Sequence, residues 1–87
     1  MIVGSQWKEL QGKRRYIATD KDPPVYENDK ESLAYWMLAS RINETFGGQP
    51  ATVGEIYYGI TRPLRMSSSD TADLVTQARR AGYLKIE

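Results

Sequence analysis

Hydrophobic positions recur at helical spacing in three stretches of the chain. In residues 28–46 apolar side chains cover most of a helix circumference, which is typical of a central helix: Leu33, Ala34, Tyr35, Trp36, Met37, Leu38, Ala39, Ile42 and Phe46. A second, shorter stretch has one apolar face, formed by Val53, Ile56, Tyr57 and Ile60. A third has an inner stripe of Thr71, Leu74, Val75, Ala78 and Ala81. The periodicity therefore predicts three helices that pack together.

Capping signals indicate where the first helix begins and ends. Asn28 and Glu31, three residues apart, have the form of a capping box, so we expect the helix to begin at Asn28 or Asp29. Gly47-Gly48 can adopt the left-handed conformation of a helix C-terminus, and Pro50 prevents any continuation.

The other two helices carry similar signals. Thr52 and Glu55 form a second capping box, and Pro63 limits the helix that follows to about two turns. One of the serines in Ser67-Ser68-Ser69 is expected to cap the third helix, which Gly82 ends.

The N-terminal part has a different pattern, with aromatic and β-branched residues in Lys13–Thr19 that favour a strand on a partly exposed sheet. Two prolines in Asp20–Pro24 indicate a loop after it. Gln6–Leu10 either pairs with that strand across a turn at Gln11-Gly12 or forms one helical turn. At the other end, Tyr83–Ile86 is typical of a terminal strand.

The amino-acid composition limits the kinds of catalytic and metal site that the chain can form. The chain of 87 residues is long enough for one domain, residues 1–87, with residues 1–27 as a strand and loop extension and residues 28–87 as the helical core and terminal strand. It contains no cysteine and no histidine, which excludes zinc fingers, disulfides, thiol nucleophiles and histidine-based triads. We therefore expect no catalysis, no cofactor and no metal.

Four acidic residues, Asp20, Asp22, Glu27 and Asp29, lack the spacing of a calcium loop and are better interpreted as a solvated acidic segment. Neither a secretory signal nor a membrane-spanning segment is evident, so we expect a cytoplasmic protein without a membrane partner or a small-molecule substrate. The formal charge of +1 is too balanced to indicate a nucleic-acid partner by itself, and any such partner must be recognised locally.

The order of helix, short capped helix, turn, third helix and Gly82-Tyr83-Leu84 in residues 30–87 resembles the winged helix-turn-helix DNA-binding superfamily. Thr52–Ile56 corresponds to the start of that family's second helix, Ser68–Val75 to the start of its recognition helix, and Arg79–Leu84 to its exit into the first wing strand. The resemblance implies a compact α+β, mainly α domain of three helices with a small antiparallel sheet.

One departure from the family pattern lies at the wing, because the sequence ends at Glu87 without a second wing strand. A lone strand leaves its amides and carbonyls without ladder partners. We therefore expect the N-terminal strand, Arg14–Thr19, to pair with Leu84–Ile86 and form the sheet.

The resemblance also implies that the third helix enters the major groove of double-stranded DNA. Its early and exposed positions would then lie at base edges: Ser68, Ser69, Thr71, Asp73, Thr76 and Gln77. Phosphate contacts are expected chiefly from Arg62 and Arg65 of the connector, with further ones from Arg80, Arg14 and Arg15. The competing interpretation is that these cations are solvated or complement the negative end of the helix dipole.

Two hypotheses follow. The first is a small DNA-binding protein, a transcriptional regulator or an accessory factor of a phage, plasmid or other mobile element, acting as a homodimer or in a larger assembly. The second is a protein-protein interaction module, an adaptor or inhibitor on the same fold, with Tyr58, Trp7 and the arginines as contacts. Asp70 and Asp73 favour the second hypothesis, because carboxylates repel phosphates.

Overall fold

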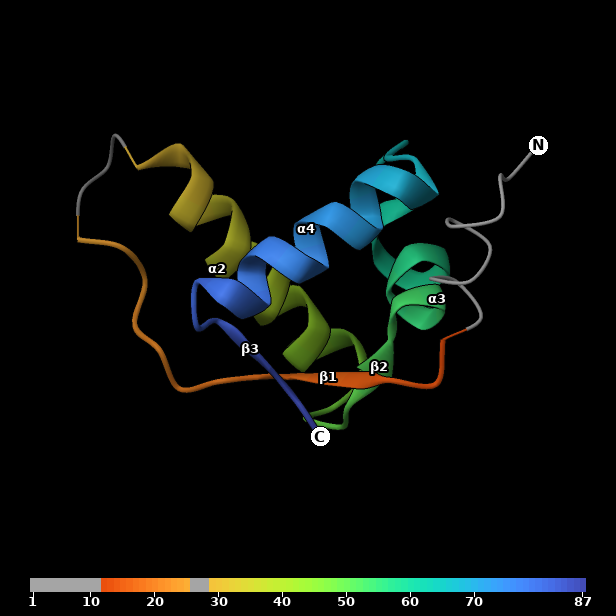
Figure 1. Ribbon diagram of the computed structural model, residues 1–87, viewed down its shortest axis with the longest axis horizontal. Helices are drawn as coiled ribbons and strands as arrows, with labels where there is room; N and C mark the ends of the chain where they lie inside the picture. Colours follow the sequence, from red (N-terminus) through yellow and green to blue (C-terminus); the bar gives the residue numbers. More distant parts are fainter. Residues whose placement is uncertain (1–11, 26–28) are drawn as a thin grey trace.

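Three helical segments lie on one side of a small sheet in the computed structural model, which describes residues 12–25 and 29–87 (Figure 1). The elements in chain order are β1 (Arg15–Ala18), α2 (Lys30–Thr45), β2 (Ala51–Thr52), α3 (Val53–Ile56), the π-helical turn η1 (Tyr57–Thr61), α4 (Ser68–Arg80) and β3 (Leu84–Ile86). The predicted α+β, mainly α architecture with an antiparallel sheet is confirmed. Gln6–Leu10 and Trp7 lie outside the described residues.

The sheet joins the two ends of the chain. Its order is β2-β1-β3, with β1 antiparallel to both neighbours. Tyr16 faces Ile86 and Ala18 faces Leu84, so the predicted pairing of the N-terminal strand with the C-terminal strand is confirmed. The third strand, β2, is not predicted by the sequence because it has only two residues and precedes a strong helix start.

The first helix, α2, begins one residue later than a cap at Asn28 would place it. The Asp29 carboxylate accepts a hydrogen bond of 3.1 Å from the amide of Ser32, so Asp29 is the N-cap and Glu31 completes no capping box with it. Hydrogen bonds from Ser32 hold the pKa of Asp29 below its usual value. The expected C-terminus is confirmed, with Gly47 and Gly48 at φ 60° and 83°.

The second helix begins at the predicted capping box. The amide of Glu55 donates to the Thr52 hydroxyl at 3.2 Å, and the amide of Thr52 donates to the Glu55 carboxylate at 3.0 Å. The helix then widens into η1, where the amide of Arg62 donates to the carbonyl of Tyr57 at 2.7 Å. Pro63 follows at once, as the sequence predicts.

The third helix, α4, is capped by the Ser67 hydroxyl, which accepts from the amide of Asp70 at 3.1 Å. Its predicted inner stripe is largely confirmed, since Thr71, Val75 and Ala78 are buried. They contribute to one core formed by α2, α3, η1, α4 and the inner face of the sheet, in which the largest fully covered aliphatic side chains are Ile42, Ile56 and Val75.

A buried hydroxyl pair fixes α4 against η1. The Thr61 and Thr71 hydroxyls lie 2.5 Å apart, and the Thr71 hydroxyl also donates to the carbonyl of Ser67 at 2.8 Å. Both threonines are almost completely buried. The pair joins the end of one helix to the start of the next across the connector.

Removing one member of this pair should destabilise the fold more than removing both. We expect Thr71→Val to lower the free energy of unfolding by about 1–3 kcal/mol, because the buried Thr61 hydroxyl loses its principal partner. Thr61→Val with Thr71→Val should be close to neutral, since no polar group is then left unpaired. Urea denaturation of the two single variants and the double variant measures this, and additive losses would contradict it.

Candidate nucleic-acid interface

The exposed face of α4 is polar and carries both signs of charge. Opposite the buried Thr71, Val75 and Ala78 lie six residues that we name the α4 face: Ser69, Asp70, Asp73, Thr76, Gln77 and Arg80. Ser69 and Thr76 are half-buried, and the other four are exposed. Hydroxyl, amide and carboxylate groups on one helix face can form hydrogen bonds to base edges in a major groove.

Two predicted base-contacting residues do not belong to this face. Ser68 is buried, and Thr71 is fully buried with its hydroxyl bonded to Thr61. The expectation that they are exposed is therefore wrong. The physical reason is that Ser67 caps the helix, so Ser68 and Thr71 lie one turn apart on the side that faces the core.

The exposed cations of the sheet come from both ends of the chain. Arg15 and Lys85 alternate with buried Tyr16 and Leu84, and the register of β1 and β3 places Arg15 and Lys85 on the outer face of the sheet. Arg14 is also exposed. Lys85 is not among the predicted site residues, although its alternation with Leu84 and Ile86 is visible in the sequence.

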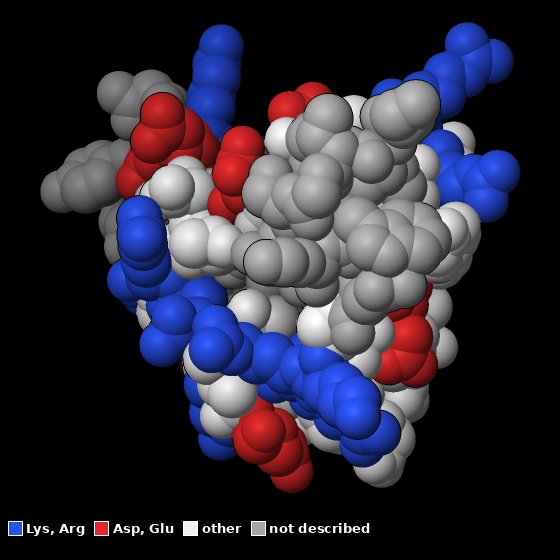
Figure 2. Space-filling model, turned by 45° about the vertical axis from the view of Figure 1, so that its right-hand side comes forward, with Lys and Arg blue, Asp and Glu red and all other residues white. Residues whose placement is uncertain are grey.

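The last turn of α4 adds two more exposed cations, Arg79 and Arg80, which also complement the negative end of the helix. Figure 2 shows Lys and Arg side chains in a band across the lower part of the molecule, the part that holds the sheet in Figure 1. The sheet and the C-terminal end of α4 therefore form the basic side of the molecule.

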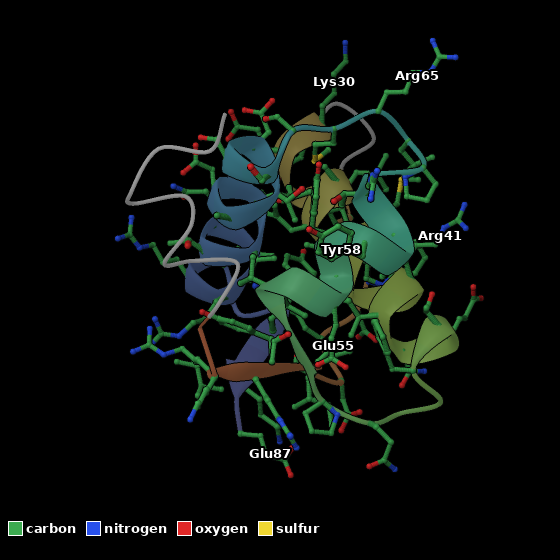
Figure 3. The ribbon with its side chains drawn as sticks, turned by 90° about the vertical axis from the view of Figure 1, so that its right-hand side faces the viewer. Lys30, Arg41, Glu55, Tyr58, Arg65 and Glu87 are labelled. Atoms are coloured by element: carbon green, nitrogen blue, oxygen red, sulfur yellow. The ribbon has the colours of Figure 1, made fainter. Side chains whose placement is uncertain are left out.

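The connector arginines lie elsewhere. The guanidinium of Arg62 lies 5.4 Å from the ring centre of Tyr58, in a cation–π contact. Arg65 has a φ of 63°, an uncommon value for a residue other than glycine. Its side chain points outward at the upper edge of the molecule in Figure 3, whereas the sheet lies at the lower edge. The structure does not bring Arg65 together with Arg14 and Arg15.

The segment after β1 holds the C-terminal end of α4 in place. The Thr19 hydroxyl donates to the carbonyl of Gly82 at 2.6 Å. The Lys21 ammonium donates to the carbonyl of Ala81 at 2.5 Å and lies 4.6 Å from the ring centre of Tyr83. The Lys21 contact satisfies the carbonyl of the C-cap residue Ala81, and both contacts fix the basic last turn of α4 relative to the sheet.

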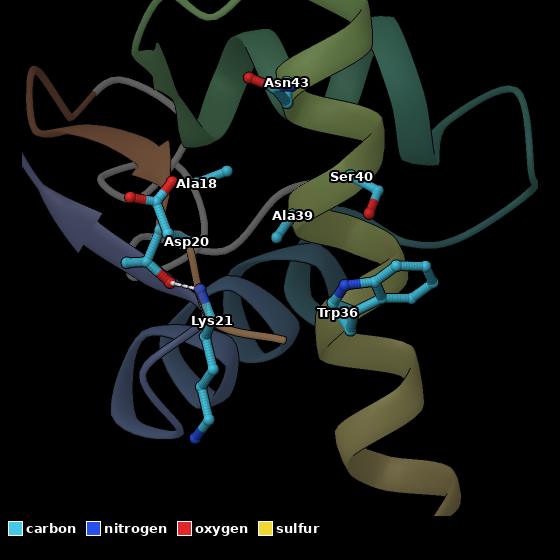
Figure 4. Close-up of a pocket in the computed structure, with 8 residues that line it drawn as sticks. Ala18, Asp20, Lys21, Trp36, Ala39, Ser40 and Asn43 are labelled. Carbon is cyan, nitrogen blue, oxygen red and sulfur yellow. Dashed lines mark hydrogen bonds between the residues drawn. The ribbon is translucent and has the colours of Figure 1, made fainter. Parts of the chain in front are cut away.

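A shallow recess of about 150 Å³ lies between this segment and α2 (Figure 4). It is lined by Ala18, Thr19, Asp20, Lys21, Trp36, Ala39, Ser40 and Asn43. Within it the amide of Lys21 donates to the Thr19 hydroxyl at 3.4 Å. Thr19 and Lys21 on one side of the recess are thus held by hydrogen bonds within the protein.

Other features bear on the expected chemistry. Asp20, Asp22 and Asp29 are exposed, Glu27 lies outside the described residues, and no three potential metal ligands converge within residues 12–25 and 29–87. No helix in those two ranges is long and apolar enough to cross a membrane.

Searches with protein-family models, curated proteins and solved structures gave no match to this chain.

Lys21 offers a test of how the end of α4 is held. We expect Lys21→Met to lower the free energy of unfolding by about 1 kcal/mol, because the hydrogen bond to Ala81 and the contact with Tyr83 are both lost. Thermal denaturation monitored by circular dichroism measures the loss. Lys13→Met, at an exposed position just before β1, is the matched control, and an equal loss in both variants would contradict the assignment.

Proposed function

We propose that this chain binds double-stranded DNA through the α4 face, with phosphate contacts from the basic side of the molecule. The observation that carries the proposal is the position of β1. It lies at the centre of the sheet beside β3, the strand that follows α4, and so brings Arg14 and Arg15 close to the edge strand that carries Lys85. Cations from two segments far apart in the sequence thereby lie near the C-terminal end of α4, a helix whose outer face is exposed.

The two parts of this surface have different roles in the proposal. Arg14, Arg15, Lys85 and Arg80 bind phosphates, which supplies affinity independent of sequence. The rest of the α4 face reads bases: Gln77 can form two hydrogen bonds to an adenine, and Asp73 can accept a hydrogen bond from the amino group of cytosine.

The two carboxylates of the α4 face are compatible with this division between phosphate binding and base reading. Asp70 and Asp73 disfavour close contact of the helix start with phosphate, and they favour selection among base pairs where an acceptor is required. Site-selective binding of this kind is what a small transcriptional regulator or a mobile-element accessory factor requires, and we place the chain in that class.

The salt dependence of DNA binding tests the phosphate contacts. Binding to a fluorescein-labelled random-sequence duplex is measured by fluorescence anisotropy at several salt concentrations. We expect Arg14→Ala with Arg15→Ala to weaken binding and to reduce the slope of log K against log salt concentration by about 2, since each phosphate contact contributes about 0.9. Arg62→Ala with Arg65→Ala is the matched control and should leave the slope unchanged.

The outcomes separate the alternatives. A slope reduced only by the connector pair would move the phosphate contacts to Arg62 and Arg65. No salt-sensitive binding by the natural sequence would overturn the proposal. Gln77→Ala should leave binding to random duplex unchanged and reduce discrimination at a selected site by about 1–3 kcal/mol.

A second function is favoured by one specific observation. Tyr58 is 56% exposed, with Arg62 against its ring and Tyr57 packed edge-on at 5.0 Å between ring centres. Exposed tyrosine and arginine are the residues most often found at the centre of protein interfaces. A protein that is retained from host lysate by the natural sequence but not by Tyr58→Ala with Arg62→Ala would support the interaction module.

A further inference from the structure

One face of α2 is left uncovered by the fold. Six exposed residues on it, which we name the α2 stripe, are Lys30, Leu33, Ala34, Met37, Arg41 and Glu44. Apart from the adjacent Leu33 and Ala34, they recur at spacings of three or four, so all six lie along one side of the helix. The buried residues Leu38, Ala39 and Ile42 lie on a different face. The sequence pattern predicts apolar packing around most of this helix, but Leu33 and Met37 remain 38% and 51% exposed.

The stripe borders an apolar groove of about 320 Å³. Ala34, Met37, Leu38 and Arg41 of α2 form one wall, and the rest of the lining comes from Ile60, Thr61, Leu64, Met66 and Leu74. Leu64 is 65% exposed at its rim. Exposed apolar surface gathered in one groove is typical of a protein interface rather than of a solvated face.

The α2 stripe carries opposite charges at its two ends. Lys30 and Glu44 lie at opposite ends, each seven residues from Met37. When two copies of α2 pack antiparallel about a two-fold axis at Met37, Lys30 of each copy faces Glu44 of the other. In a parallel arrangement, Lys30 would face Lys30 and Glu44 would face Glu44, which is repulsive.

We infer that the α2 stripe is a homodimer interface in which two copies of this chain pack antiparallel along α2. Met37 meets its symmetry mate at the axis, and the apolar stem of Arg41 covers Leu33 of the second copy. Leu64 flanks the contact and closes the groove over the partner helix. The stripe itself lies outside the α4 face, so the inference does not depend on the proposed function.

A charge-swap series tests the register of the two helices. Sedimentation equilibrium of the natural sequence should show a dimer that dissociates on dilution. Lys30→Glu and Glu44→Lys should each raise the dimer dissociation constant about tenfold, because each change turns two attractive pairs into two repulsive ones. The two changes together restore both pairs with reversed sign and should return the dissociation constant to within about threefold of the original.

Neither single change should weaken the dimer by unfolding the helix. Lys30→Glu places a carboxylate at the positive end of α2, and Glu44→Lys places an ammonium at its negative end, so both substitutions complement the helix dipole. Circular dichroism melting checks this in each variant. A monomeric mass for the natural sequence at every concentration would overturn the inference and leave the groove to a different partner. A double variant as weak as the sum of the two singles would also overturn it.

A cross-linking experiment tests the axis itself. The chain contains no cysteine, so Met37→Cys introduces the only one, and its two copies should form a disulfide-linked dimer under mild oxidation. Val25→Cys is the control, because Val25 is even more exposed and lies outside the stripe. Equal cross-linking of both variants would contradict the placement of the axis at Met37.

The dimer and the DNA interface can fail separately. Salt-sensitive DNA binding by a monomeric chain would overturn the dimer and leave the proposed function standing. A dimer that binds no duplex would do the reverse.

Discussion

The structure depends on the pairing of β1 with β3. The terminal strand exposes a row of amides and carbonyls that a folded protein must satisfy. Here β1 supplies the partner, from a point that precedes all three helices in the chain, and Tyr16 faces Ile86. The same strand offers its other edge to β2, so one segment holds the sheet together and covers the core with Tyr16.

This constraint also determines the position of charge. Because β1 must turn Tyr16 inward, strand alternation turns Arg15 outward, and the register does the same for Lys85. The sheet part of the basic side is thus a by-product of sheet formation, and the basic side meets the mixed charges of the α4 face at Arg80. Affinity and selectivity would then come from different elements, which allows either to change without disturbing the other.

The features that the sequence predicts are the ones set by local chemistry. The Thr52–Glu55 capping box, the Ser67 cap and the left-handed glycines after α2 each involve residues only a few positions apart. The pairing of β1 and β3 is also predictable, because an unpaired strand is costly.

The features that the sequence does not predict depend on tertiary packing. The two residues of β2 form a strand only because Tyr16 lies beside Ala51. The burial of Ser68 is not predicted, because a polar residue early in α4 fits an exposed site equally well until the cap residue fixes the phase of the helix. Thr71 is expected both in the inner stripe and at base edges, and only the first expectation is right. The same phase uncertainty hides the uncovered face of α2, since Leu33, Ala34 and Met37 are as apolar as the residues that reach the core.

The long reach of β1 has a consequence for how the protein is made. The contacts that hold the end of α4 span 63 residues at Thr19 and Gly82, so they cannot form until the final residues of this segment have left the ribosome. We expect the locally capped helices to form earlier than the sheet, because contacts of large sequence separation form slowly. The sheet part of the basic side would then be the last surface that a newly made chain acquires.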